Sequence, residues 1–199
     1  KVLSNEPAEC LGAYVISMTT SASDILSISF LQKEANIKNR LRVVPLFETL
    51  DDLINAKGIM ESLFSQKWYR NLIKNKQEVM IGYSDSSKDA GKICASWHQY
   101  KAQEEIIKLG KKFNINITFF HGRGGSAGRG GGPIQATLRS QPPNSVKGKI
   151  RISGVSDATT AGGIEFHTSS GGGAGYGSRI TSDASGNIHF LTRSNNSAW

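Results

Sequence analysis

Cysteine is scarce in this 199-residue chain, and long apolar runs are missing altogether. The two cysteines, Cys10 and Cys94, stand far apart and outside any metal-ligand spacing, so we expect reduced thiols and a cytoplasmic location. No apolar run approaches the roughly 18 residues of a membrane helix, and no secretory signal is visible. We therefore expect no membrane partner.

The C-terminal part of the chain has no excess of either charge, although the net charge of the whole chain is +8. Residues 151–199 carry three Lys/Arg against three Asp/Glu, so the whole excess lies in residues 1–150. Many of those basic residues are spaced along an expected helix, as is typical of a solvated helix face: Lys101, Lys108, Lys111 and Lys112. We expect no nucleic-acid partner, because a site for small anions explains the arginines equally well.

Residues 1–151 alternate apolar runs of strand length with long amphipathic stretches. The expected strands are residues 13–17, 41–47, 78–82 and 115–120, and the expected helices are residues 23–34, 50–64 with a further piece to 74, and 88–112. Helix-starting residues precede the three long stretches: Ser23-Asp24, Thr49 with Asp51 and Asp52, and Ser86-Ser87. This order predicts an α/β domain of four parallel βα units.

Residues 152–199 have a different composition, rich in Gly, Ser and Thr. Short runs that alternate apolar and polar residues lie between Gly/Ser clusters, at residues 163–168, 178–181 and 187–192. The pattern predicts a short all-β tail with tight turns. We therefore place a domain boundary between residues 151 and 152.

The segment from Phe120 to Pro133 is the most informative one. It holds seven glycines together with His121, Arg123 and Arg129. Glycine lets the backbone approach a ligand, exposed N–H groups suit anions, and arginine offers a planar fork for carboxylate or phosphate. We interpret the segment as an anion clamp at the carboxyl end of a strand; the alternative is a flexible glycine linker.

Polar residues follow the other expected strands as well. Glu48 follows the second strand, and Asp85 and Lys88 follow the third. In a parallel sheet or barrel these positions converge, so Glu48 and Asp85 are candidate ligands of Mg²⁺ or Mn²⁺. The alternatives are first-turn or capping acids for this pair, a surface lysine for Lys88, and a satisfied loop histidine for His121.

These residues, in this order, resemble the phosphoenolpyruvate carboxylase family over about residues 10–151. The resemblance is dense, collinear and carried by seven motifs. They are Tyr14-Val15-Ile16-Ser17-Met18, Val44-Pro45-Leu46-Phe47-Glu48-Thr49, Trp68-Tyr69-Arg70, Met80-Ile81-Gly82-Tyr83-Ser84-Asp85-Ser86 through Lys88-Asp89-Ala90-Gly91, Tyr100-Lys101-Ala102-Gln103, the glycine-rich clamp, and Ser140-Gln141-Pro142-Pro143.

The resemblance implies a partial (β/α)₈ barrel and a carboxy-lyase that fixes carbon dioxide. In that family bicarbonate and phosphoenolpyruvate give oxaloacetate, which enters the tricarboxylic acid cycle, and phosphate. By resemblance Glu48 and Asp85 ligate Mg²⁺ or Mn²⁺. The candidate catalytic and substrate-binding residues are Lys88, His121, Arg123 and Arg129, with Gly130 and Gly131 in the same loop.

Two departures from the family pattern qualify these expectations. The family enzyme is several times longer, and its phosphate-handling histidine lies in an N-terminal part absent here, so we expect this chain alone to be inactive. After Arg151 the chain leaves the pattern, and Ala161-Gly162-Gly163-Ile164-Glu165-Phe166 and residues 171–177 resemble bacteriophage tail-fibre sequences. The alternative function is therefore a structural or adhesive trimeric module, and we expect a homo-oligomer.

Overall fold

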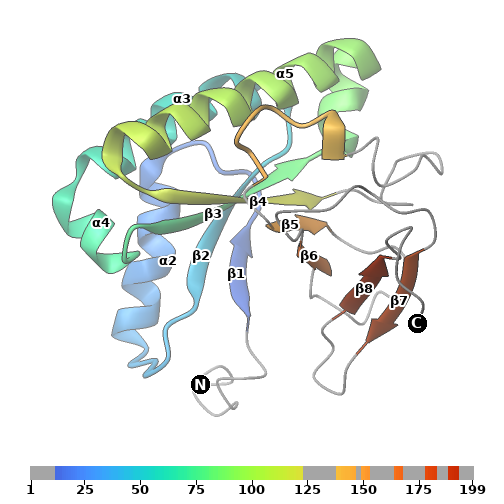
Figure 1. The fold of residues 1–199 in the computed structure, drawn as a ribbon. Coiled ribbons are helices and arrows are strands. Elements are labelled where there is room, and N and C mark those ends of the chain that lie inside the picture. The colour runs from blue at the N-terminus through green and yellow to red at the C-terminus, as the bar shows by residue number, and fades with distance from the viewer. Residues whose placement is uncertain are drawn as a thin grey trace.

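The computed structural model describes residues 12–122, 138–146 and 149–152, together with three short strands nearer the C-terminus. In the part of the chain that the structure describes, four strands and four helices alternate, with α3 and α4 in succession, and only strands follow them (Figure 1). The elements are β1 (Ala13–Ile16), α2 (Ala22–Glu34), β2 (Arg42–Phe47), α3 (Leu50–Ser65), α4 (Lys67–Leu72), β3 (Lys76–Gly82), α5 (Ser84–Phe113), β4 (Asn116–Gly122), β5 (Lys149–Ile152), β6 (Ile164–His167), β7 (Ser178–Ser182) and β8 (Ile188–Thr192).

Strands β1 to β4 are parallel and lie side by side in the order of the sequence. The longest register joins β3 to β4 from Lys76↔Asn116 to Gly82↔Gly122. Strand β5 adds to β4 in parallel, β6 follows in antiparallel orientation, and β7 pairs with β8 in a separate hairpin. The expectation of four parallel strands alternating with helices is confirmed.

The core lies between the sheet and its helices, with α3 and α5 running together over one face (Figure 1). Val79, Ile81 and Phe119 alternate along β3 and β4 toward this face and are at most 2% exposed. Every second residue of these strands therefore points toward the helices and packs against their apolar faces. None of the described helices combines the length and apolarity needed to cross a membrane.

Two helices begin earlier than expected. Helix α2 is preceded by Ser21 rather than Ser23, and the carboxylate of Asp24 accepts hydrogen bonds from the N–H groups of Thr20 and Ser21. Helix α5 begins at Ser84, so Ser86-Ser87 lies inside it; the helix breaks at Gly91, where φ is 75° and ψ is 161°. The prediction for Thr49 is correct, because its hydroxyl accepts from the Asp52 N–H at 3.1 Å.

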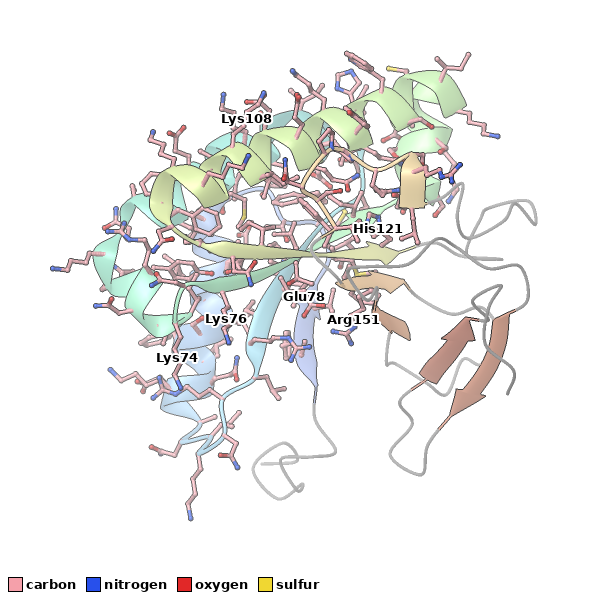
Figure 2. The ribbon with its side chains drawn as sticks, viewed as in Figure 1. Lys74, Lys76, Glu78, Lys108, His121 and Arg151 are labelled. Atoms are coloured by element: carbon pink, nitrogen blue, oxygen red, sulfur yellow. The ribbon has the colours of Figure 1, made fainter. Side chains whose placement is uncertain are left out.

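The opposite face of the sheet carries an ion cluster that the sequence analysis did not predict. Glu78, whose side chain is 7% exposed, accepts from Arg42 Nε at 2.7 Å and Arg151 Nη1 at 2.8 Å. The Arg151 guanidinium also lies 4.6 Å from the centre of the Phe120 ring. Figure 2 shows Glu78 and Arg151 on the side of the sheet away from α5. The cluster ties β2, β3 and β5 together and compensates the buried carboxylate.

Candidate active site at the carboxyl ends of the strands

Glu48 and Asp85 are neighbours at the carboxyl ends of β2 and β3. Burial raises the pKa of the Glu48 carboxyl, and the adjacent charge of Asp85 raises it further, while a backbone hydrogen bond from Met18 acts in the opposite direction. Such an electrostatic contact requires the two carboxylates to approach closely. The charge of Asp85 thus acts on the Glu48 carboxyl, and the metal-ligating role of the two acids stays a prediction.

Gly82 makes this approach possible. A Cβ placed on Gly82 would lie 2.5 Å from the Glu48 Cβ and 2.9 Å from its Cα. Any larger residue at the end of β3 would push the Glu48 backbone away. The glycine therefore sets the position of the first carboxylate.

Helix capping, the alternative role for the acids, falls largely to other residues. The Asp52 carboxylate accepts from the N–H groups of Glu48 and Thr49 at 3.2 Å and 3.0 Å, so Asp52 fixes the turn after β2. Asp89 accepts from the Leu50 N–H at 3.4 Å and links the start of α5 to the start of α3. Glu48 is left outside the α3 cap, whereas Asp85 does lie in the first turn of α5.

Lys88 lies on the exposed side of the same turn. Its ammonium donates to Asp85 Oδ1 at 2.8 Å, and this bond raises the pKa of Lys88. The two side chains are 74% and 42% exposed, so the pair is an easily broken surface contact. Asp85 therefore faces a carboxylate and an ammonium at once.

His121 belongs to β4 rather than to the loop beyond it, as does Gly122. The expected strand stopped at Phe120, which makes the expected loop start two residues too early. The His121 ring is 1% exposed, and Nδ1 lies 2.8 Å from the Tyr83 hydroxyl. The histidine thus braces the residue that joins β3 to α5.

The remaining predicted site residues, Arg123, Arg129, Gly130 and Gly131, lie outside the described residues. Within the part of the chain that the structure describes, no three His, Cys, Asp or Glu side chains gather as a metal site would require. A cation held by Glu48 and Asp85 would need further oxygen ligands. The sequence analysis placed Asp52 at the start of a helix but missed the role of Tyr83, which only its place directly after a strand could have indicated.

Comparison with known proteins shows which family the chain is similar to. The family model described as phosphoenolpyruvate carboxylase matches residues 1–155. The chain is 57% identical over 152 residues to phosphoenolpyruvate carboxylase 3 of Arabidopsis thaliana, which is 76% of this chain and 16% of that protein. It is equally similar to the C4 phosphoenolpyruvate carboxylase of Flaveria trinervia, with the same identity and coverage.

A third relative, the phosphoenolpyruvate carboxylase of Nicotiana tabacum, is 54% identical over 151 residues, or 76% of this chain and 16% of that protein. The chain thus spans about a sixth of the length of these relatives. The matches give no support to the tail-fibre alternative. The family model covers more than half of the chain, and the chain belongs to the phosphoenolpyruvate carboxylase family.

Proposed function

We propose that the chain supplies the metal- and substrate-binding part of a phosphoenolpyruvate carboxylase. The substrates are phosphoenolpyruvate and bicarbonate, and the products are oxaloacetate and phosphate. The observation that carries the proposal is the contact between Glu48 and Asp85, which lie side by side at the carboxyl ends of parallel strands. In α/β folds ligands bind at this end of the sheet.

The carboxylate pair fits a hard divalent cation such as Mg²⁺ or Mn²⁺. Burial is the main reason why the pKa of Glu48 is raised, and repulsion by the neighbouring negative charge of Asp85 raises it further. Carboxylate oxygens are the ligands that these cations prefer, and a dication neutralises both charges. When bound, the cation supplies Lewis-acid stabilisation of negative charge on the substrate.

The proposed role of Lys88 depends on neutralisation of the Asp85 charge by the cation. In the structure its ammonium is held by Asp85. Once the Asp85 charge is engaged elsewhere, Lys88 is released toward the pocket, where its charge attracts phosphate or bicarbonate. The exposed and weak ion pair is suited to such an exchange.

The other candidates share the task of binding anions. Arg123 and Arg129, with Gly130 and Gly131, would close the phosphoenolpyruvate and bicarbonate pocket with guanidinium groups and backbone N–H groups. His121 acts by position: its hydrogen bond to Tyr83 holds the segment that presents Asp85. The catalytic role proposed for His121 by resemblance stays a prediction.

We also propose that the four βα units form part of a (β/α)₈ barrel. Strands β1 to β4 lie in sequence order, and β5 continues that order in parallel. A doubly wound sheet reverses its order at a switch point, whereas a barrel keeps it. The sheet order therefore favours a barrel segment.

A coupled assay for oxaloacetate tests the proposal. We expect no turnover from the chain alone, and turnover when the N-terminal part of a relative is supplied. The matched variants Glu48→Gln and Asp85→Asn should abolish that turnover while leaving the far-ultraviolet circular dichroism unchanged. Turnover by the chain alone, or full activity of both variants, would contradict the assignment.

A further inference from the structure

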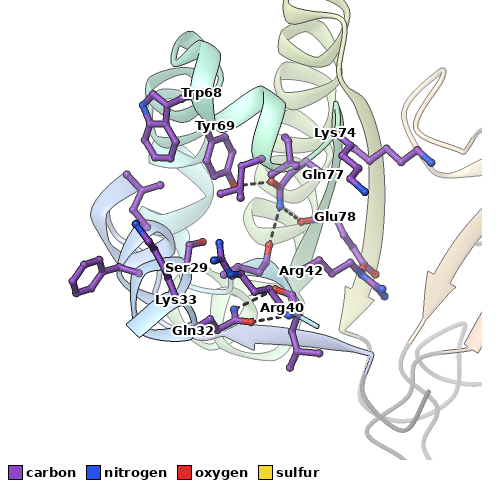
Figure 3. A pocket seen from close by; sticks show the side chains of 17 residues that line it. Ser29, Gln32, Lys33, Arg40, Arg42, Trp68, Tyr69, Lys74, Gln77 and Glu78 are labelled. Atoms are coloured by element: carbon purple, nitrogen blue, oxygen red, sulfur yellow. Dashed lines mark hydrogen bonds and ion pairs between the residues drawn. The ribbon is translucent and has the colours of Figure 1, made fainter. Parts of the chain in front are cut away.

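A cavity lies at the other end of the strands, far from Glu48 and Asp85. Its volume is about 670 Å³, and it is enclosed by α2, α4 and the starts of β2 and β3 (Figure 3). Leu26, Val43 and Ile73 contribute apolar wall. A cavity of this size suits a small organic molecule, since ligand sites commonly measure about 300–1,000 Å³.

The uncharged polar groups on the wall are already engaged within the chain. The Gln32 side chain accepts from the Leu41 N–H at 2.7 Å and donates to the Leu41 carbonyl at 3.2 Å. The Tyr69 hydroxyl donates to Gln77 at 2.8 Å, and Gln77 donates to the Val43 carbonyl at 3.0 Å. Figure 3 shows these bonds as dashed lines. The amides therefore stiffen the wall, and the interior offers a ligand mainly apolar contact.

Aromatic and aliphatic side chains are exposed to solvent at the rim of the cavity. Phe30 is 60% exposed, Trp68 is 53% exposed and Leu72 is 44% exposed. They come from α2 and α4 and line the same cavity. Exposed large apolar side chains gathered around a hollow mark a binding surface.

Cations surround this apolar hollow. Lys33, Arg40, Arg42, Lys74 and Lys76 line it, against Glu78 as the acidic lining residue. Arg42 is paired with Glu78, and across the described ranges no ion pair is found for the other four. Figure 3 shows Lys33 on α2, Arg40 before β2 and Lys74 before β3, so the positive charge comes from three separate segments. An occupant with a negative charge is strongly favoured over a neutral one.

The backbone at Lys74 places this residue at the rim of the cavity. Its φ is 50° and that of Asn75 is 53°, so both residues occupy the left-handed region. Glycine or asparagine fits that region better than lysine. Both residues lie in the turn that ends α4, where the N–H groups of Lys74 and Asn75 donate to the carbonyls of Asn71 and Arg70, so this turn fixes the place of Lys74 at the rim.

From these observations we propose that the cavity binds a small amphipathic anion, with a flat apolar body and one carboxylate, sulfonate or phosphate group. The body lies between the apolar wall and the open ring of Trp68, while the anionic group meets the lysines and Arg40. Sugars and other polyols are disfavoured because the wall amides are already bonded. The site is distinct from the carboxylate pair and does not depend on the proposed carboxylase activity.

Calorimetry with three probes tests this inference on the whole chain. We expect 2-naphthoate to bind, 2-naphthamide to bind at least about fivefold more weakly at low salt, and acetate to show no binding. Raising the salt from about 0.02 M to about 0.3 M should narrow the gap between the first two, because the lysines are exposed to screening. Equal binding of the acid and the amide would overturn the role of the cations.

Variants locate the site. Trp68→Ala and Lys74→Gly should each weaken naphthoate binding, by about twofold to fivefold for the lysine. Lys74→Gly should leave the melting temperature unchanged or higher, because glycine relieves the left-handed strain, so lost binding would not reflect lost folding. The matched controls Trp97→Ala and Lys92→Ala, on exposed positions of α5, should bind as the parent chain does. Equal losses in the controls, or a Trp68-dependent dimer that excludes naphthoate, would overturn the proposal.

Discussion

Substitutions at Asp85 and Lys88 should change Mn²⁺ affinity in opposite directions. Asp85→Asn removes one of two carboxylates but keeps the shape of the side chain. The attraction between a dication and a unit charge about 4 Å away is about 2 kcal/mol even at the dielectric constant of water. We therefore expect at least about a thirtyfold loss of affinity.

Lys88→Ala removes a cation that competes for the same carboxylate. The Lys88 ammonium lies 2.8 Å from Asp85 Oδ1, but the two side chains are 74% and 42% exposed. An exposed pair of this kind contributes little, so Mn²⁺ should bind only modestly more tightly, by at most about fivefold. Lys92→Ala is the matched control, because Lys92 is an exposed lysine of the same helix for which no ion pair is found in the described ranges.

Water-proton relaxation reports Mn²⁺ binding directly and needs no turnover. Titrations of the parent chain, the two variants and the control at one ionic strength give four dissociation constants. The reasoning is refuted if Asp85→Asn binds as tightly as the parent chain, because Asp85 would then act in the helix turn alone. It is also refuted if Lys88→Ala weakens binding, because Lys88 would then support the cation rather than compete with it.

Four further outcomes follow from the packing and charges. Gly82→Ala should cost about 1–3 kcal/mol in urea unfolding and weaken Mn²⁺ binding, whereas Gly58→Ala, with nothing within 4 Å of the new Cβ, should stabilise α3 by about 0.5–1 kcal/mol. Gly91→Ala should cost about 1–3 kcal/mol, since its backbone at φ 75° and ψ 161° is nearly restricted to glycine; a parent-like midpoint would contradict that strain. Lys108 and Lys57 lower the pKa of Glu105 to about 2, so about 1 kcal/mol of stability, present above pH 4.5, should be lost as the pH falls toward 2, and Glu105→Gln should not show this loss. Light scattering should find self-association, because β1 is a sheet edge with Tyr14 and Val15 each 38% exposed; truncation after Lys149 shows whether the tail contributes, and a monomer in both forms would contradict the edge argument.

The alternation of strands and helices was predictable because, in each segment, several apolar residues repeat the spacing typical of a strand or of a helix. Strand β2 and helix α3 differ from their expected bounds by one residue at most, and Thr49 and Asp52 mark the boundary between them chemically. The start of α5 was not predictable in this way, because its N-cap is Tyr83, which has no capping side chain. Two serines inside the helix gave a stronger local signal than the true beginning.

The site was predictable where it follows from the direction of parallel strands. Glu48 and Asp85 each follow a strand end, and the direction of parallel strands predicted that they come close, with helix capping as the alternative. The support around them was not predictable, since Asp89 reaches α3 across 39 positions of sequence and His121 reaches Tyr83 across 38. Contacts between distant segments depend on packing that no local pattern records.

The two proposed sites lie at opposite ends of β3, and this separation makes them independent. Strand β3 runs from Lys76, on the cationic cavity, to Gly82, beside Glu48. Six steps along a strand cover about 20 Å, which is twice the Debye length at 0.1 M salt. Substitutions that far apart with no shared partner add rather than couple. Lys74→Gly should therefore leave Mn²⁺ affinity unchanged, and Asp85→Asn should leave naphthoate affinity unchanged. If either substitution lowered both the Mn²⁺ affinity and the naphthoate affinity, β3 itself would have shifted.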